Sequence, residues 1–371
     1  MIESRFVEFI KKWFAYFQGK LEVKINGEIE AGKYLHEQVL TPEYTPDLKW
    51  ESATVNDSVV AADVVALDSP LPLKKRGAMK TASGTIPKTG MKKYLIESQV
   101  QQLITIKNLG KLMQFVKSLF ADLEKCGLGI KERVEYMFLQ GISTGQMLVG
   151  VLDGDIDPDE KGDNTGVAVR ADFGFLPENK FGASIPWGDA GYKPISDFVR
   201  AMEATETSTS VAWMSKKAYK LMRDSDEAKQ LCATFRGIPV LKESVLPTPT
   251  KNDFNDAFEN EYGVKFKIID RSIVTEKNGK RKSVKPFDEN AIVLLAQDTN
   301  LGRLVYGDLV ENDPSFRVAG VQYSNLNTYI LLSKFAKNEP WREFTTAQAM
   351  VLPVIDGVED IKLLNIKEVQ G

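Results

Sequence analysis

The residues best suited to chemistry lie in one acidic segment, which reads LDGDIDPDEKGDNTG from Leu152 onward. Its carboxylates are those of Asp153, Asp155, Asp157, Asp159, Glu160 and Asp163. Asp153, Asp155 and Asp157 occupy every second position, as the first oxygen ligands of a calcium-binding loop do. The match then fails, because Pro158 and Asn164 stand where such a loop requires glycine and glutamate. The segment therefore predicts a solvated turn rather than a metal site, and contact with a basic partner surface is a third interpretation.

The other reactive side chains exclude most enzyme mechanisms. His36 is the only histidine, which removes most Ser-His-Asp and Cys-His schemes and zinc sites built on several histidines. Cys126 and Cys232 are far apart in the sequence and indicate free thiols in a reducing cytoplasm. No phosphate-binding glycine loop is present. We therefore predict no cofactor, no metal and no enzymatic activity, with an unrecognised carboxylate-based hydrolase as an alternative because Asp and Glu are abundant.

A long basic segment raises the question of its partner. Between Leu71 and Tyr94 the cations are Lys74, Lys75, Arg76, Lys80, Lys88, Lys92 and Lys93, and no Asp or Glu lies between Asp68 and Glu97. The whole chain is nonetheless slightly acidic, with 48 basic and 51 acidic residues. No aromatic residue interrupts the basic segment, which disfavours stacking on nucleic-acid bases. We predict that these cations contact carboxylates of a neighbouring protein surface, and a merely solvated basic hairpin is the alternative.

Hydrophobic periodicity predicts the helices and strands that position the acidic and basic segments. The chain of 371 residues is long enough for two domains, or for one large domain with inserts. An amphipathic helix is predicted from Ile2 to Phe17, ended by Gly19, and an extended arm from Lys20 to about Val59. The helix is expected to pack on its own fold or on a neighbouring chain rather than on a membrane. Residues 59–68 and 92–100 are predicted to flank the basic segment as strands of a long hairpin.

A helical block and a series of short strands make up the rest. Apolar periodicity predicts helices over 112–123 and 130–142, and the sequence CGLG at 126–129 either separates them or kinks one long helix. Strands are predicted on both sides of the acidic segment, and Asn278-Gly279 predicts a tight hairpin. Most strands meet by hairpins rather than helical crossovers, so the fold class is α+β. No apolar run is long enough to span a membrane and no signal peptide is expected.

Several phrases, taken in order, resemble the tailed-phage major capsid proteins that are similar to the lambda major capsid protein and have the Hong Kong 97-type fold. They are RVEYMFLQGISTGQMLV (133–149), ADFGF (171–175), WGDAGYKPISDFVRAM (187–202), TSVAWMSKKAYKLM (209–222), YGVKFKIIDRSIVTEKNGKRKSVKPFDENAIVLL (262–295), GRLVYGDL (302–309) and WREFTTAQAMVLPVIDGVEDIKLLNI (341–366). Each phrase is short, but the ordered set covers the chain from about Leu71 to the C-terminus. The first seventy residues match poorly.

The resemblance implies a layout for the chain. It predicts an N-terminal arm with an amphipathic helix over 1–51, an extended two-stranded loop over 52–96, and an axial domain over 186–315. A peripheral domain with a spine helix and a long sheet is expected over 97–185 and 316–371. In such a layout the extended loop lies across an adjacent subunit and carries Lys74, Lys75, Arg76, Lys80 and Lys88. The acidic residues Asp153, Asp155, Asp157, Asp159 and Glu160 are candidates for an intersubunit contact.

The resemblance also implies a function. Axial domains of the family cluster at the centres of pentamers and hexamers, and the icosahedral shell encloses double-stranded DNA. Scaffold and portal proteins are expected partners, and a decoration protein is a further candidate. The packaged DNA is expected to be enclosed without sequence-specific binding, and no membrane partner is expected. The protein is expected in the virion after assembly in the host cytoplasm. A cellular encapsulin-like shell around protein cargo is the alternative with the same fold.

Overall fold

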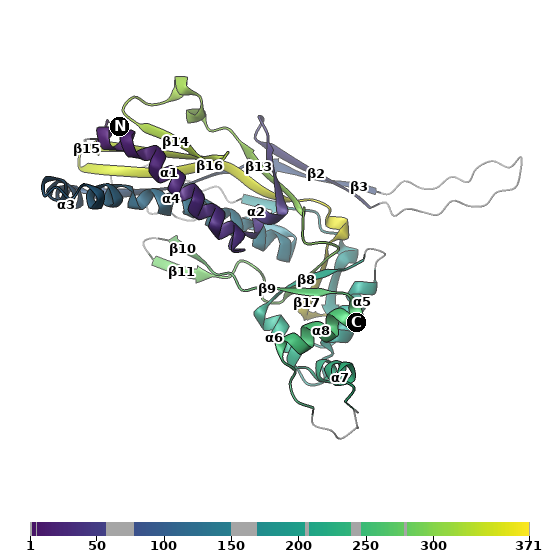
Figure 1. The fold of residues 1–371 in the computed structure, drawn as a ribbon. Helices are drawn as coiled ribbons and strands as arrows, with labels where there is room; N and C mark the ends of the chain where they lie inside the picture. Colours follow the sequence, from purple (N-terminus) through teal and green to yellow (C-terminus); the bar gives the residue numbers. More distant parts are fainter. Residues whose placement is uncertain are drawn as a thin grey trace, which may run out of the picture.

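Two large sheets and two hydrophobic cores organise the chain (Figure 1), and the larger core includes side chains from both sheets. The computed structural model describes residues 2–4, 6–56, 78–149, 169–204, 208–238, 246–277 and 280–370. The larger sheet has six strands, in the order β1 (Leu40–Tyr44), β13 (Gly302–Gly307), β16 (Trp341–Ile355), β15 (Ile330–Asn338) and β14 (Gln322–Leu326), with β4 (Lys88–Ile96) also paired to β16. Because β16 is 15 residues long, it pairs with β13 near its end and with β4 and β15 along its first part.

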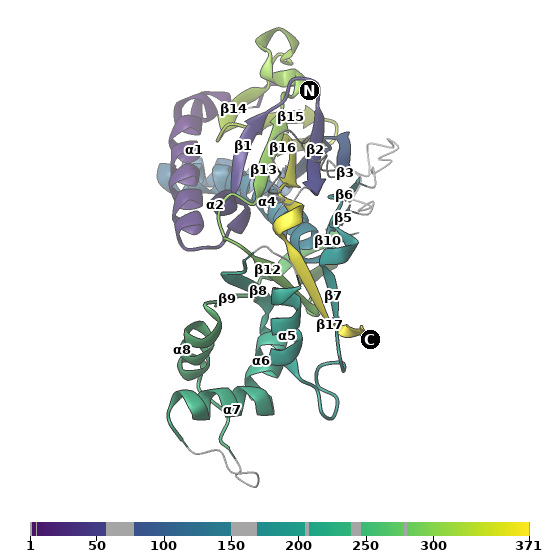
Figure 2. The ribbon, with the colours of Figure 1, turned by 90° about the vertical axis from the view of Figure 1, so that its right-hand side faces the viewer.

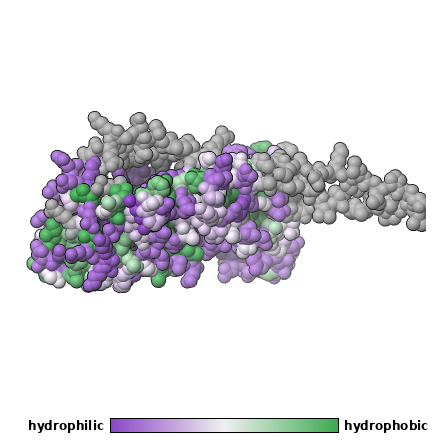
Figure 3. Space-filling model, turned by 90° about the horizontal axis from the view of Figure 1, so that it is seen from above, coloured by the Kyte–Doolittle hydropathy of each residue, from purple (hydrophilic) through white to green (hydrophobic). Residues whose placement is uncertain are grey.

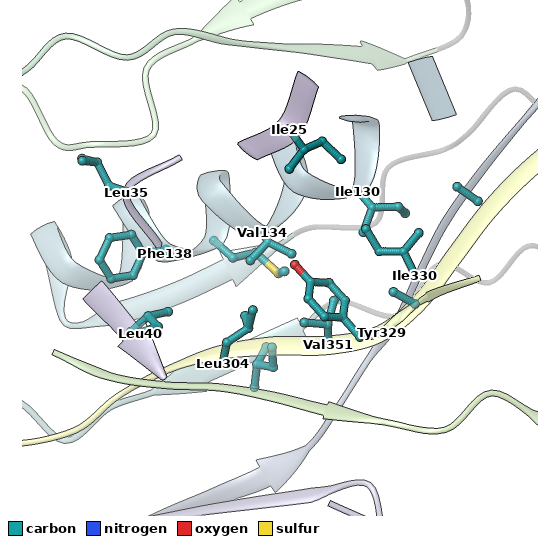
Figure 4. Packing of buried hydrophobic residues seen from close by; sticks show 14 of the residues in the cluster. Ile25, Leu35, Leu40, Ile130, Val134, Phe138, Leu304, Tyr329, Ile330 and Val351 are labelled. Carbon is teal, nitrogen blue, oxygen red and sulfur yellow. The ribbon is translucent and has the colours of Figure 1, made fainter. Parts of the chain in front are cut away.

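One long helix, α4 (Leu112–Thr144), packs along this sheet and buries an almost continuous apolar face. The CGLG sequence does not break it. A Cβ on Gly127 would lie 2.9 Å from side-chain carbons of both Leu21 and Leu326. The glycine therefore allows the helix to approach its neighbours closely, and Figure 4 shows α4 residues such as Ile130 and Val134 facing Tyr329 and Val351.

The N-terminal segment is more ordered than the sequence suggested. Helix α1 (Val7–Glu30) passes through Gly19, so the predictions of a helix end there and of an extended arm after it were wrong. Leu21 and Ile25 continue the buried face, and their packing outweighs the low helix propensity of one glycine. The helix is followed by α2 (Leu35–Val39), which contacts α4.

The strands around the basic segment pair differently from the prediction. The hairpin consists of β2 (Lys49–Asn56) and β3 (Ala78–Thr85), which are antiparallel. Residues 59–68 lie outside the described part of the chain. The second predicted strand ends at Ile96, as β4, and pairs with β16 instead. Glu97 begins helix α3 (Glu97–Asn108), because the Gln99 side chain accepts a hydrogen bond from the Ile96 amide at 3.1 Å and caps the helix.

The second sheet has five strands covered by four short helices (Figure 2). Its order is β7 (Lys180–Ala183), β17 (Lys362–Val369), β12 (Ala291–Leu295), β8 (Val211–Ser215) and β9 (Lys265–Ile269), and the helices are α5 (Pro194–Glu203), α6 (Lys216–Asp224), α7 (Asp226–Phe235) and α8 (Lys251–Tyr262). Two further hairpins are β5 (Gln146–Val149) with β6 (Val169–Asp172), and β10 (Ile273–Lys277) with β11 (Lys280–Val284). None of the helices in the described ranges is long and apolar enough to cross a membrane.

The α+β class is confirmed, and so are the predicted strands on both sides of the acidic segment, as β5 and β6. The division into domains stays a prediction. Several strands pair across its expected boundaries. In particular, β13, from the range 186–315, joins the six-stranded sheet, whereas β7, from the range 97–185, and β17, from the range 316–371, join the five-stranded sheet. The chain therefore crosses between the two sheets more often than one inserted segment requires.

Candidate functional site

The base of the β2–β3 hairpin is held firmly against the rest of the fold. Trp50 on β2 is buried and its ring lies 5.9 Å from that of Phe173. Gly84 on β3 lies under the same indole, and a Cβ there would be 2.8 Å from Trp50 Nε1. A larger residue at this position would push the two strands apart. The hairpin is thus fixed at its root and extends away from the six-stranded sheet (Figure 1).

A polar clamp fixes the other side of this root. Arg303 on β13 donates to Asp356 Oδ2 at 2.6 Å, to Glu43 Oε2 at 2.8 Å and to the Glu51 carbonyl at 2.7 Å. Ser52 on β2 donates to the same Asp356 at 2.7 Å. The hydrogen bond to Asp356 is the main cause that raises the pKa of Arg303, so the guanidinium stays charged. One arginine therefore joins β1, β2, β13 and the end of β16.

The structure places the predicted contact residues unevenly. Lys74, Lys75 and Arg76 lie outside the described residues, and so do Asp153, Asp155, Asp157, Asp159 and Glu160. Lys80 belongs to β3, where its backbone pairs with Thr54. Lys88 begins β4, is exposed, and pairs with Met350. Because β3 lies beside β6, the basic and the acidic segments arise from neighbouring strands. Their contacts stay a prediction.

Sequence reasoning missed a buried polar cluster around the only histidine. His36 on α2 is fully buried, and its Nδ1 lies 2.6 Å from Glu135 Oε2 on α4. Glu37 accepts a hydrogen bond from Tyr329 at 2.9 Å and pairs with buried Lys131. The cluster joins α2, α4 and the turn between β14 and β15. Its sequence signal was weak: Lys131 and Glu135, one turn apart, interrupt an otherwise apolar helix face.

The electrostatics of this cluster indicate a structural role. Burial lowers the pKa of His36, but hydrogen bonds to Glu135 and Glu37 outweigh it, so the pKa is raised. Burial would raise the pKa of Glu37, yet His36 and Lys131 hold it far below its usual range. Every charge thus has a partner of opposite sign inside the fold. An arrangement of this kind ties α2 to α4 and offers no exposed nucleophile or base to a substrate.

A hollow in the described surface lies between α5 and α7 and has a volume of about 750 Å³. Glu227, in its lining, accepts hydrogen bonds from the backbone amides of Ile195 at 2.7 Å and Ser196 at 3.2 Å. Glu227 therefore caps the start of α5. Among the described residues no group of three His, Cys, Asp or Glu side chains is placed to hold a metal ion. On the face seen in Figure 3, hydrophilic and hydrophobic residues intermingle without one dominant apolar patch.

Comparison with known proteins decides the family. The sequence profile described as Phage major capsid protein E matches residues 33–354. The chain belongs to the phage major capsid protein E family. This match begins inside the N-terminal segment and runs through both sheets to the end of β16. No curated protein sequence gives a significant match. The family is one of structural shell proteins, and the resemblance predicted from ordered phrases is confirmed.

Solved structures with related shapes are distant in sequence. A crystal structure assigned to a prophage capsid protein of Escherichia coli CFT073 is 13% identical, with 78% of this chain and 79% of that chain covered and a TM-score of 0.49. For the capsid of cyanophage A-1(L) the identity is 12%, the coverage 89% and 90%, and the TM-score 0.44. For the SrpI encapsulin of Synechococcus elongatus PCC 7942 these values are 12%, 90% and 86%, and 0.36. All three scores are below 0.5, so the family assignment rests on the sequence profile alone.

Proposed function

We propose that this capsid protein assembles as pentamers and hexamers into the icosahedral shell that encloses the double-stranded DNA genome of a tailed bacteriophage. The observation that carries the proposal is the anchored root of the β2–β3 hairpin. The strand pair is fixed at its root by Trp50 and Arg303 but extends away from the six-stranded sheet. It therefore leaves surface that an adjacent subunit can cover. A closed shell requires such self-complementary surfaces and no catalytic group.

The charged segments supply the register of this contact. In the proposed arrangement Lys74, Lys75, Arg76, Lys80 and Lys88 face carboxylates of the adjacent subunit. Asp153, Asp155, Asp157, Asp159 and Glu160 are the candidate carboxylates. Complementary charges of this kind set orientation and encounter rate more than they set affinity.

The domain and partner assignments follow the same proposal. The part with α4 and the six-stranded sheet corresponds to the peripheral domain, and the part with the five-stranded sheet corresponds to the axial domain. Scaffold and portal proteins would direct closure, and a decoration protein would bind outside. Assembly would take place in the host cytoplasm and the product would be found in the virion. We assign the chain no enzymatic role.

The contents of recovered particles test this function. Particles formed in infected or co-expressing cells should contain nuclease-protected double-stranded DNA of uniform length. Shells that enclose a folded protein cargo and no DNA would instead support an encapsulin-like compartment. Gel analysis of the nucleic acid and mass spectrometry of the protein content separate the two results.

A further inference from the structure

The β10–β11 hairpin stands apart from both hydrophobic cores. It forms a two-stranded sheet of its own and extends below α4 (Figure 1). Ile273, at its root, is buried, whereas Val274, one residue further, is 62% exposed. All of β11 except Val284 is exposed. An isolated two-stranded hairpin is marginally stable in water, so this one is expected to gain stability from a partner.

The charge of the hairpin is strongly positive. From Ile273 to Val284 it carries four cations and one carboxylate, which leaves a net charge of +3 on a chain whose total is -3. The carboxylate, Glu276, pairs with Arg281 at 2.7 Å. Lys280 and Lys282 are exposed and form no ion pair with any residue that the structure describes. Two cations of the hairpin are therefore available to an external anion.

The strand register concentrates this charge. Lys277 and Lys280 are directly opposite each other at the last described pair of the hairpin, and Lys282 is opposite Thr275. Like charges in directly opposite positions destabilise a strand pair. An anion bound at this end would relieve the repulsion. The backbone register thus places two lysine positions opposite each other at this end of the hairpin.

We propose that the β10–β11 hairpin binds the phosphate backbone of double-stranded DNA inside the shell, without sequence preference. This inference rests on the proposed function, since it requires the shell to enclose DNA. Lysine and arginine side chains that neutralise phosphates release counterions, and this term supplies most of non-specific DNA binding. The proposal also orients the subunit: the side that carries β10 and β11 faces the interior.

The composition of the hairpin favours DNA over an acidic protein surface. Stable protein interfaces bury an apolar centre. Among the described positions of the hairpin, the exposed apolar side chain is Val274 alone. Lysine side chains on an open strand pair instead resemble contacts to a phosphate backbone, which fix position and carry no sequence information.

The salt dependence of DNA binding tests the proposal. The purified chain is titrated against a random-sequence duplex of about 30 base pairs and followed by fluorescence anisotropy at several salt concentrations between about 50 and 200 mM. The variant K280Q/K282Q should lower the slope of log K against log salt by about 2, roughly one unit for each lost phosphate contact. The control K11Q/K12Q removes two exposed cations from α1 and should keep the wild-type slope.

Two results would overturn the DNA contact. One is an equal slope for K280Q/K282Q and the wild-type chain. The other is that K280Q/K282Q binds DNA like the wild type but no longer forms shells. The hairpin would then be a contact between copies of the chain. Either result leaves the proposed function in place as long as the wild-type chain forms shells that protect DNA. Failure of the wild-type chain to form shells would refute that function separately.

Discussion

At the scale of single residues, the His36 cluster shows how a charged group is kept inside an apolar core. His36 and Glu135 are both fully buried, and Lys131 with Tyr329 surrounds Glu37. Removing one partner of such a pair leaves an unpaired charge in the core. Alanine at position 36 is therefore expected to reduce the free energy of unfolding by about 3 kcal/mol. Urea denaturation of the wild type and the variant at neutral pH measures this loss.

The same residue predicts a pH dependence of stability. Because hydrogen bonds to Glu135 raise the pKa of His36 above its usual value of about 6.5, the pair is fully stabilising below that pH. The stabilisation is lost as the pH rises through the pKa of the folded protein. The free energy of unfolding should thus fall as the pH rises from about 6.5 into the mildly alkaline range. Burial raises the pKa of Cys126 to about 12 and that of Cys232 to about 11, so both thiols stay protonated over this range.

The variant H36Q isolates this effect, since His36 is the only histidine. Glutamine keeps a hydrogen-bond donor for Glu135 but has no proton to lose. Its unfolding free energy should change less over the same rise in pH than that of the wild type. Equal changes for both proteins would show that His36 does not control the alkaline loss.

At the scale of secondary-structure elements, two helical glycines should respond to alanine in opposite directions. Gly19 in α1 has no atom within 4 Å of an added Cβ, so G19A should stabilise the protein by about 0.5 to 1 kcal/mol. Gly127 in α4 meets Leu21 and Leu326, so G127A should destabilise it by about 1 to 3 kcal/mol. Thermal and urea denaturation compare the two variants. Equal effects would contradict the packing described for α1 and α4.

The root of the β2–β3 hairpin depends on the fork shape of one arginine. R303K keeps the charge but cannot donate to Asp356, Glu43 and the Glu51 carbonyl together. Amide hydrogen exchange in β2 should become about ten-fold faster, while exchange in β12 stays unchanged. R281K, at an exposed pair in β11, is the matched control and should leave β2 unaffected. Unchanged exchange in β2 of R303K would show that the clamp does not fix the hairpin.

Local sequence signals predicted the elements whose ends are chemically marked. Pro194 begins α5, and Gly263, with a φ of 71°, ends α8 as expected. The prediction failed where distant residues decide. Gly19 does not end α1 because Leu21 packs on α4, and the hairpin partner of β3 is set by Trp50 and Arg303 rather than by strand propensity. The His36 cluster could not be predicted for the same reason, since Glu135 lies 99 residues further along the chain.

At the scale of the whole molecule, the charge of the basic segment is expected to control assembly but not folding. The reversal K74E/K75E/R76E should abolish shells and preserve the circular dichroism spectrum and melting temperature of the subunit. Repulsion between like charges at the contact is the physical reason. The charge-preserving variant K74R/K75R/R76K is the control and should assemble. Normal shells from the reversed variant would show that these cations are merely solvated.

Electron microscopy of the purified protein, alone and co-expressed with its scaffold, tests the central claim most directly. The proposed function predicts closed shells built from rings of five and six copies, with the β2–β3 hairpin of each subunit lying over its neighbour. A protein that stays strictly monomeric under both conditions would contradict it.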